Sequence, residues 1–152
     1  MSLGWTVNTD GGARGNPGPG GAGIVLRSPD GHVVARAGAF LGSVTNNVAE
    51  YQALLWGMRA ALAHGARHLT VRADSELVVK QLRGEYRVKN EGLKPLFCQA
   101  QALRHGFDSV EFVHVRREDN AEADAVANEA MDQRCVVGEA PDPPGSDTAT
   151  LF

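Results

Sequence analysis

The sequence has few of the features that mark several common protein classes. Its 152 residues include only two cysteines, Cys98 and Cys135, which are too few for a disulfide framework or a cysteine-based metal site. No apolar run approaches the roughly 20 residues that cross a bilayer, and no signal-peptide pattern opens the chain. We therefore expect a cytoplasmic protein without a membrane partner.

An excess of positive charge, which is common in nucleic-acid-binding proteins, is also absent, because the net charge is −3. This charge is unevenly distributed. Residues 132–152 hold four acids, one base and several prolines, so residues 1–131 are neutral overall. We expect residues 132–152 to be an acidic, proline-rich and disordered tail or linker. Within the neutral part, five bases lie close together, namely Lys80, Arg83, Arg87, Lys89 and Lys94.

Hydrophobic periodicity predicts an α/β fold. The pattern favours strands at 5–9, 23–27, 32–40, 69–73 and 110–115, and helices at 48–62, 75–82, 93–105 and 120–131. Pro29-Asp30-Gly31 between two apolar runs is typical of a hairpin turn, and Gly65 of a helix end. Three strands followed by alternating helices and strands imply a mixed sheet with helices packed on it.

A glycine-rich stretch follows the first expected strand. Residues 6–23 read TVNTDGGARGNPGPGGAG, with Asp10 directly before the glycines. Asp10-Gly11 is a favoured hairpin turn, but the next β-like run begins about ten residues later. The segment from Gly18 to Gly23 fits the dinucleotide-binding pattern GxGxxG, yet a strand-like run follows it in place of the required helix. In the third interpretation, Asp10 is one ligand of a metal site.

Three further acids lie near the ends of expected elements. Glu50 falls in the first turns of a helix, Asp74 ends the fourth strand, and Asp124 opens the last helix. Because α/β folds place their ligands at such ends, these acids could join Asp10 around a metal. Each also has a simpler explanation, since acids favour helix N-termini and Asp74 could cap a helix. Spacing alone leaves both interpretations open.

Five segments resemble the type 1 ribonuclease H family, whose members cleave the RNA of RNA/DNA hybrids. They are TDGGARGNPGPGGAG (9–23), TNNVAEYQAL (45–54), ADSELVV (73–79), VKNEGLKPL (88–96) and REDNAEADAVAN (117–128). They occur in the family's order across nearly all of residues 5–131. The resemblance implies a catalytic domain over residues 1–131 with the ribonuclease H-like fold. That fold has a five-stranded mixed sheet, whose first three strands are antiparallel, and helices on both faces.

The resemblance also assigns the family's four catalytic, metal-binding carboxylates to Asp10, Glu50, Asp74 and Asp124. These acids are expected to hold two Mg²⁺ ions about 4 Å apart, with Asp10 contacting both and Mn²⁺ able to substitute. The implied activity is endonucleolytic hydrolysis of the RNA strand, which leaves 5′-phosphate and 3′-hydroxyl ends. The implied partner is an RNA/DNA hybrid, bound by a monomer.

Substrate contacts follow from the same matches. Along the minor groove, where the 2′-hydroxyl is recognised, the family matches place Gly11, Gly12, Asn16, Asn46, Asn47 and Ser75. Thr45 matches a residue that helps to hold a DNA-strand phosphate. We expect weak, salt-sensitive binding, because the Lys- and Trp-rich protrusion of some relatives is absent from this chain. The bases Arg83, Arg87, Lys89 and Lys94 are expected to carry most of it.

The loop before Asp124 departs from many relatives, which carry a histidine there. Here residues 116–120 read RREDN, and Glu118 is the candidate substitute, as a carboxylate able to relay a proton. Two other functions stay open, a DNA-cleaving nuclease of the same superfamily and a non-catalytic hybrid-binding module. Residues 132–152 could also link this domain to a further C-terminal domain of a longer chain.

Overall fold

The first three strands form an antiparallel meander. In the computed structural model, which describes residues 4–145, β1 (Trp5–Ala13) pairs with β2 (Gly18–Arg27), and β2 pairs with β3 (Val33–Val44). The amide of Ser28 donates to the carbonyl of His32 over 2.9 Å, which confirms the hairpin predicted from Pro29-Asp30-Gly31.

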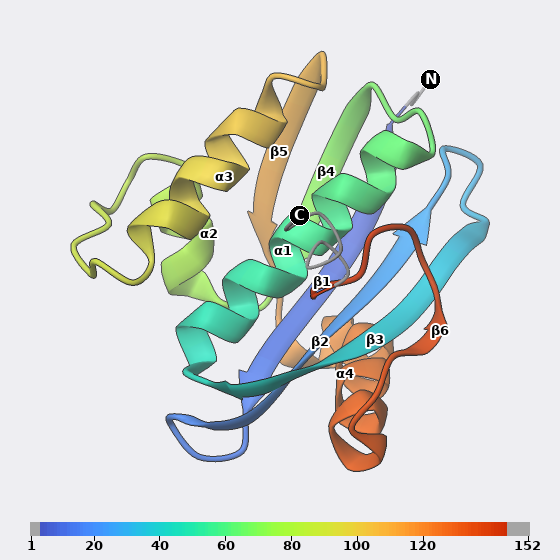
Figure 1. Ribbon diagram of the computed structural model, residues 1–152. Helices are drawn as coiled ribbons and strands as arrows, with labels where there is room; N and C mark the ends of the chain where they lie inside the picture. Colours follow the sequence, from blue (N-terminus) through green and yellow to red (C-terminus); the bar gives the residue numbers. More distant parts are fainter. Residues whose placement is uncertain (1–3, 146–152) are drawn as a thin grey trace, which may run out of the picture.

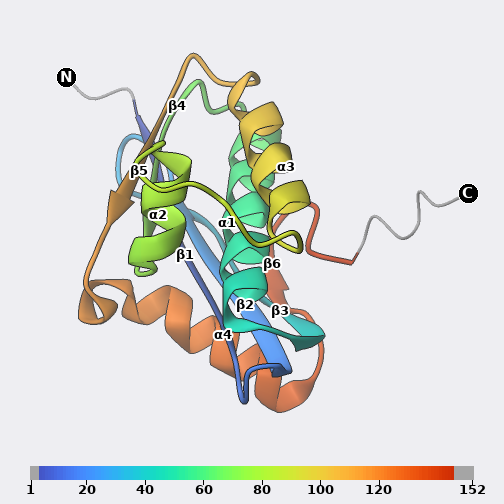
Figure 2. The ribbon, with the colours of Figure 1, turned by 90° about the vertical axis from the view of Figure 1, so that its left-hand side faces the viewer.

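The rest of the chain adds helices to both faces of this sheet (Figure 1). After β3 come α1 (Asn46–Ala63), β4 (His68–Ala73), α2 (Glu76–Leu82), α3 (Lys94–Arg104), β5 (Ser109–His114), a 3₁₀ turn (Arg117–Asn120), α4 (Ala121–Gln133) and β6 (Val137–Glu139). The strand order is β5-β4-β1-β2-β3-β6, with β4 parallel to both β1 and β5. Helices α1 to α3 lie on one face and α4 crosses the other (Figure 2).

The sheet of the described residues has six strands, so the expectation of five was wrong. The sixth strand, β6, pairs with β3 at Gly38↔Val137 and lies within the segment expected to be a tail. The indole N–H of Trp56 on α1 also donates to the carbonyl of Pro141 over 2.9 Å. This part of the segment is therefore attached to the core, while residues 146–152 lie outside the described residues. The expected boundary at residue 131 falls inside α4.

The glycine-rich stretch is mostly strand. Asp10 pairs with Gly23, and the pairing continues to Ala13↔Gly20, so the chain turns at residues 14–17. The expected strand end at residue 9 was therefore wrong, and Asp10 lies inside β1 with three residues after it. Because Gly18 to Gly23 belongs to β2 and leads into no helix, the dinucleotide-binding interpretation is excluded.

Glycines let α4 approach the sheet closely. A Cβ atom on Gly23 of β2 would lie 2.1 Å from the carbonyl oxygen of Ala123, and one on Gly38 of β3 would lie 2.1 Å from that of Val126. Contacts this short are impossible for any larger residue, so the backbone of α4 rests directly on bare strand backbone. This packing sets the height of Asp124 above the sheet.

Side-chain caps fix where two helices begin. The hydroxyl of Thr45 accepts a hydrogen bond from the amide of Val48 over 3.2 Å, and that of Ser75 accepts one from the amide of Val78 over 3.3 Å. These bonds satisfy amides that a helix leaves unpaired at its start. Since Ser75 caps α2, the neighbouring carboxylate of Asp74 is not needed for capping.

The core lies between the sheet and α1. Trp56, Tyr51 and Leu54 of α1 are fully buried, as is Ile24 of β2. The buried Tyr51 hydroxyl donates to the Gln81 side chain over 2.6 Å, which joins α1 to α2. Within the described residues, no helix combines the length and the apolar character that a membrane crossing requires.

Candidate active site

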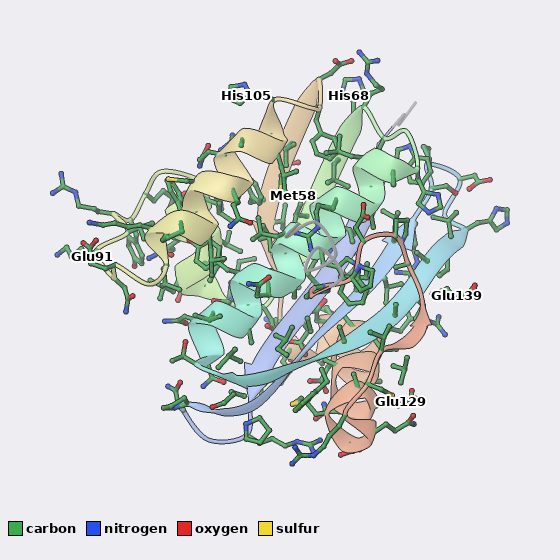
Figure 3. The ribbon with its side chains drawn as sticks, in the orientation of Figure 1. Met58, His68, Glu91, His105, Glu129 and Glu139 are labelled. Carbon is green, nitrogen blue, oxygen red and sulfur yellow. The ribbon has the colours of Figure 1, made fainter. Side chains whose placement is uncertain are left out.

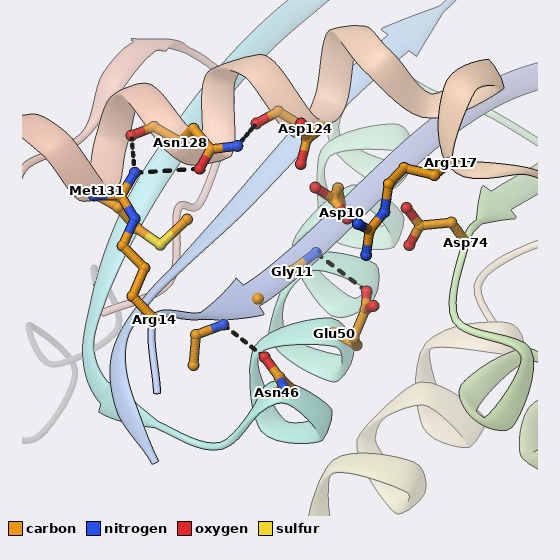
Figure 4. A pocket seen from close by; sticks show the side chains of 12 residues that line it. Asp10, Gly11, Arg14, Asn46, Glu50, Asp74, Arg117, Asp124, Asn128 and Met131 are labelled. Carbon is orange, nitrogen blue, oxygen red and sulfur yellow. Dashed lines mark hydrogen bonds between the residues drawn. The ribbon is translucent and has the colours of Figure 1, made fainter. Parts of the chain in front are cut away.

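Three carboxylates converge where β1, α1 and β4 meet (Figure 4). Asp10 lies on β1, Glu50 near the start of α1, and Asp74 directly after β4. The parallel register Thr9↔Ala73 brings the first and the last of these acids to the same end of the two strands. One oxygen of each carboxylate lies within 4.8 Å of the others.

Gly11 positions Glu50. Its amide donates to Glu50 Oε1 over 3.1 Å, so the carboxylate is fixed to the strand that carries Asp10. A Cβ atom on Gly11 would lie 2.1 Å from the carbonyl oxygen of Ala49 on α1. Gly11 therefore has a packing role in addition to the predicted substrate contact, because only glycine lets α1 start this close to β1.

Asp124 approaches the same point from α4, on the other face of the sheet, and lies near enough to Asp10 to raise the pKa of that acid. The buried Asn120 anchors the start of that helix. Its side-chain amide donates to the carbonyl of Thr9 over 2.8 Å, and its side-chain oxygen accepts from Asn8 over 3.0 Å. These bonds tie the turn before α4 to β1, and so hold Asp124 in register with Asp10.

The cluster concentrates negative charge in a buried place. Burial raises the pKa of Asp10 to about 9, helped by the neighbouring Asp124 and by the charges of Asp74 and Glu50. Burial and the charge of Asp74 raise the pKa of Glu50 to about 8, although the Gly11 amide and Arg117 act in the opposite direction. Without a cation, these two acids therefore bind protons at neutral pH.

The donor set fits a divalent metal ion. All of the ligand atoms are carboxylate oxygens, which hard cations such as Mg²⁺ and Mn²⁺ prefer over nitrogen or sulfur ligands. A cation would also offset the repulsion between the acids, which adds to burial in raising the pKa of Asp10 and Glu50. Asp10, Glu50 and Asp74 form the group best placed to bind metal, and Asp124 adjoins it.

Metal binding is expected to release protons. Since Asp10 and Glu50 are protonated near neutral pH in the metal-free protein, Mn²⁺ has to displace those protons. Affinity for Mn²⁺ should rise with pH between about pH 6 and 8, roughly tenfold per unit for each proton released. Titration calorimetry in two buffers of different ionisation enthalpy measures the protons. A pH-independent affinity would contradict the expectation, and Glu129→Gln should behave as wild type.

The acids open into a cavity of about 540 Å³. Its walls also include two cations, Arg117 from the 3₁₀ turn and Arg14 from the turn between β1 and β2. The side chain of Arg117 reaches toward Asp10 and Asp74, and no salt bridge holds it within residues 4–145 (Figure 4). The sequence analysis missed both arginines. The RREDN loop contained a signal for Arg117, but the prediction from that loop named Glu118.

Glu118, the expected substitute for the loop histidine, does not line this cavity. It lines a separate hollow of about 380 Å³ together with Asn8 and Arg72. The cause is local, because consecutive residues of a 3₁₀ turn point about 120° apart. The turn therefore directs Arg117 to the acids and Glu118 elsewhere. A role for Glu118 in catalysis remains a prediction.

Some of the predicted substrate-binding residues line the cavity, and others lie at the β1–β2 turn or at the starts of helices. Asn46 and Gly12 line the cavity, and the Asn46 side-chain oxygen accepts from the Ala13 amide over 2.8 Å. Asn16 accepts from the Asn46 amide over 3.0 Å, which links the β1–β2 turn to the start of α1. Thr45 and Ser75 act as helix caps in the structure. Asn47 lies half-buried near the start of α1, and the substrate contacts of the whole set remain predictions.

The basic cluster lies apart from the acids. Arg83 pairs with Glu85 over 3.3 Å, directly after α2, and Lys94, the first residue of α3, pairs with Glu91 over 2.6 Å on the segment between the two helices. With Arg87, this segment borders a separate hollow of about 610 Å³. Figure 3 shows Glu91 on the far side of the molecule from Glu129 of α4. Any contact of Arg83, Arg87, Lys89 and Lys94 with substrate therefore involves a region outside the acidic cavity.

The chain is similar to known nucleases. A family model described as reverse transcriptase-like matches residues 8–130. Ribonuclease HI of Halobacterium salinarum is 46% identical over 123 residues, which are 81% of this chain and 62% of the relative. A Mycobacterium tuberculosis protein named Bifunctional protein Rv2228c is 41% identical over 145 residues, or 95% of this chain and 40% of that protein. The chain thus spans less than two thirds of either relative.

Solved structures show the same fold. The crystal structure of ribonuclease H1 from Halobacterium salinarum matches with a TM-score of 0.83 at 43% identity, over 86% of this chain and 98% of that one. A second ribonuclease H1, designated LC11 and solved in complex with an RNA/DNA hybrid, matches with a TM-score of 0.81 at 40% identity. That match covers 86% of this chain and 98% of the other.

Proposed function

We propose, from the premise that the chain belongs to the type 1 ribonuclease H family, that it is an endonuclease that hydrolyses the RNA strand of RNA/DNA hybrids. The observation that carries the proposal is the convergence of Asp10, Glu50 and Asp74 within 4.8 Å, with Asp124 beside them, in a cavity open to solvent. Members of this family use divalent metal ions, and we infer that this chain uses Mg²⁺, with Mn²⁺ as a substitute.

When two such ions are bound, they supply Lewis-acid chemistry, which activates water and stabilises the leaving 3′-oxygen. The residues of the chain hold and orient this site. Asp10 of β1, Glu50 of α1 and Asp74, which follows β4, would hold the ions, since one oxygen of each carboxylate lies within 4.8 Å of the others. The bond from the Gly11 amide fixes the rotamer of Glu50, so the site is preorganised before substrate binds. The products carry 5′-phosphate and 3′-hydroxyl ends.

Selection of RNA requires groups that recognise the 2′-hydroxyl. Gly12 lines the cavity beside the acids, and within residues 4–145 a Cβ atom on it would meet nothing within 4 Å apart from its own chain neighbours. A ribose can therefore approach this backbone without moving the protein. The side-chain amide of Asn46 lies on the same wall and offers a donor. These two residues support recognition of RNA over DNA.

The test is cleavage of a hybrid whose RNA strand is labelled at its 5′ end, with Mg²⁺, with Mn²⁺ and with a chelator. We expect internal cuts in the RNA strand only, none with chelator, and 3′ ends that a polymerase can extend. Equal cleavage of a DNA duplex of the same sequence would point to the DNA-cleaving alternative. Tight binding of the hybrid without any cleavage would point to the binding module.

Arg117 is expected to stabilise the phosphate under attack, because its side chain enters the acid-lined cavity and forms no salt bridge with any of residues 4–145. Arg117→Ala should lower kcat by about 10- to 100-fold with a smaller change in KM. Arg117→Lys should recover part of the loss, since it keeps the charge and loses the planar fork. Steady-state kinetics on the labelled hybrid measures both constants.

The matched control is Arg116→Ala, because Arg116 is exposed and does not line the cavity. Equal losses in the Arg116 and Arg117 variants would show a general charge effect and contradict the specific role. Glu118→Gln belongs in the same series. Turnover at the wild-type rate would remove the expected proton-relay role of Glu118.

Other features of the chain's use remain proposals. We propose that the domain acts as a cytoplasmic monomer and can form part of a longer protein. The second of these is supported by the Mycobacterium tuberculosis relative, of which this chain matches only 40%. Size-exclusion chromatography with light scattering tests the first.

A further inference from the structure

Arg14 lies at the opposite end of the acidic cavity from Arg117. Figure 4 shows Arg14 to one side of the four acids, near Asn128, whereas the side chain of Arg117 lies between Asp10 and Asp74. Arg14 belongs to the turn between β1 and β2, and its side chain crosses to α4. Arg14 has no part in the metal site, and no predicted substrate contact includes it. The inference that follows rests on the proposed function, because it concerns how the cleaved strand is held in this cavity.

The guanidinium of Arg14 binds two side chains of α4. It forms a salt bridge of 2.7 Å with Asp132 and a hydrogen bond of 3.2 Å with the side-chain oxygen of Asn128. The exposed fractions of the side chains in the salt bridge are 47% and 64%. Pairs this exposed contribute little to stability, because water solvates both partners well. A competing anion can therefore replace Asp132 at small cost.

The backbone of Arg14 is fixed, although its side chain reaches solvent. Its amide donates to the carbonyl of Pro19 over 2.8 Å, and a Cβ atom on Gly18 would lie 2.1 Å from its carbonyl oxygen. The tight turn thus fixes the backbone position from which the Arg14 side chain extends. A planar guanidinium on a fixed base suits bidentate binding of a phosphate, which is stronger than binding by a neutral donor.

The charges around Arg14 favour a phosphate ligand. Within the described residues, Arg14 and Arg117 are the two cations that line the cavity, whose other charged groups are the four acids. A polyanionic strand in this cavity meets repulsion beyond the metal site unless a cation stands there. Arg14 lies in this part of the cavity, and the carboxylate of Asp132 occupies the position on its guanidinium where a phosphate would bind.

We propose that Arg14 binds a backbone phosphate of the RNA strand near the cleavage site, and that Asp132 holds Arg14 in the free protein and releases it when the strand binds. Binding then exchanges one anion for another on the same guanidinium. Asp132 lowers the affinity of the free protein for any polyanion that cannot displace it. The ligand class is a phosphodiester backbone next to the site of hydrolysis.

A purely structural role for the pair gives a different expectation. If the salt bridge only joined the β1–β2 turn to α4, removing either partner would disturb the cavity in the same direction. Under the proposal the two variants change the affinity for the strand in opposite directions. Arg14→Ala removes the side chain that binds the phosphate, whereas Asp132→Asn releases that side chain from its salt bridge. This difference of sign separates the two roles.

The experiment measures dissociation constants for a dye-labelled RNA/DNA hybrid by fluorescence anisotropy with Mg²⁺. Every variant carries Asp10→Asn so that the strand stays intact. Arg14→Ala should weaken binding about tenfold, Arg14→Lys about threefold, and Asp132→Asn should tighten it about threefold. Arg14→Ala should also reduce the slope of log affinity against log salt by about one.

The control for charge alone is Glu129→Gln, one turn earlier on the exposed side of α4 (Figure 3). With Arg14→Ala present, Asp132→Asn should tighten binding no more than Glu129→Gln does. Weakening by both single variants, or equal tightening by Asp132→Asn with and without Arg14, would overturn the proposal. Failure of the proposed function would appear separately, as absence of cleavage by the chain with Asp10 intact.

Discussion

The Asp10→Asn variant is expected to cleave the RNA strand at least about 1,000-fold more slowly than the wild-type chain. Asp10 is the acid that the other three surround, and an amide oxygen carries no charge with which to hold a divalent cation. The side chain keeps its size, so the loss would come from metal binding and not from packing. Single-turnover cleavage of the labelled hybrid measures it, and equal rates would contradict the assignment of this site.

The same variant is expected to be more stable than the wild type when no divalent metal is present. In the folded metal-free chain the pKa of Asp10 is raised to about 9, from a usual value of 3.8. Between these values the folded chain binds more protons than the unfolded chain, so the wild-type free energy of unfolding falls as pH rises. Asparagine cannot ionise and avoids this loss. We expect a gain on the order of 2 kcal/mol near pH 8.

Thermal unfolding with chelator at about pH 5 and pH 8 measures this gain, which should be larger at the higher pH. The control is Asp132→Asn, which neutralises a carboxylate whose side chain is 64% exposed and should change the free energy of unfolding little. A lower midpoint for Asp10→Asn than for wild type at pH 8 would show that the carboxylate stabilises the metal-free fold, contrary to expectation.

The Gly11→Ala variant is expected to lose both stability and activity. The added Cβ atom would lie 2.1 Å from the carbonyl oxygen of Ala49 and 2.6 Å from the amide nitrogen of Glu50. Helix α1 has to move away from β1, and Glu50 moves with it. We expect the free energy of unfolding to fall by about 3 kcal/mol and kcat to fall about 100-fold. Urea denaturation and kinetics on the hybrid measure the two effects.

Gly12→Ala is the matched control, because a Cβ atom on Gly12 would meet nothing within 4 Å in the described part of the chain, apart from its own chain neighbours. Its free energy of unfolding should change by less than about 1 kcal/mol. If Gly12 contacts a ribose as predicted, KM should rise in this variant without loss of stability. Equal stabilities of the two alanine variants would show that the approach of α1 to Gly11 is not required.

The sequence identified the candidate acids but not how the chain holds them. Asp10 was expected at a strand end, since glycine has little preference for strands and the apolar pattern stops before it. In the structure the strand continues through Gly11 and Gly12, because β2 pairs with them. The cause of the glycines in β2 is tertiary, as the contact between Gly23 and Ala123 shows. Local periodicity carries no record of such contacts.

Two other differences have similar causes. Three residues, Val137–Glu139, are too few to show a strand period, and their pairing with β3 depends on contacts distant in sequence such as Trp56 with Pro141. In the loop before α4, Glu118 was the predicted residue, whereas the structure directs Arg117 to the acids. The direction of each side chain depends on the 3₁₀ turn, and that turn depends on Asn120 binding β1.

The position of Asp10 within β1 divides the site into a rigid part and an adaptable one. β1 is an inner strand, with β2 on one side and β4 on the other, so its backbone moves only if two ladders of hydrogen bonds open together. Arg14 and Arg117 instead stand on short turns at the rim of the cavity. Sequence changes at the rim can therefore adjust how a strand is held without altering the spacing of the acids.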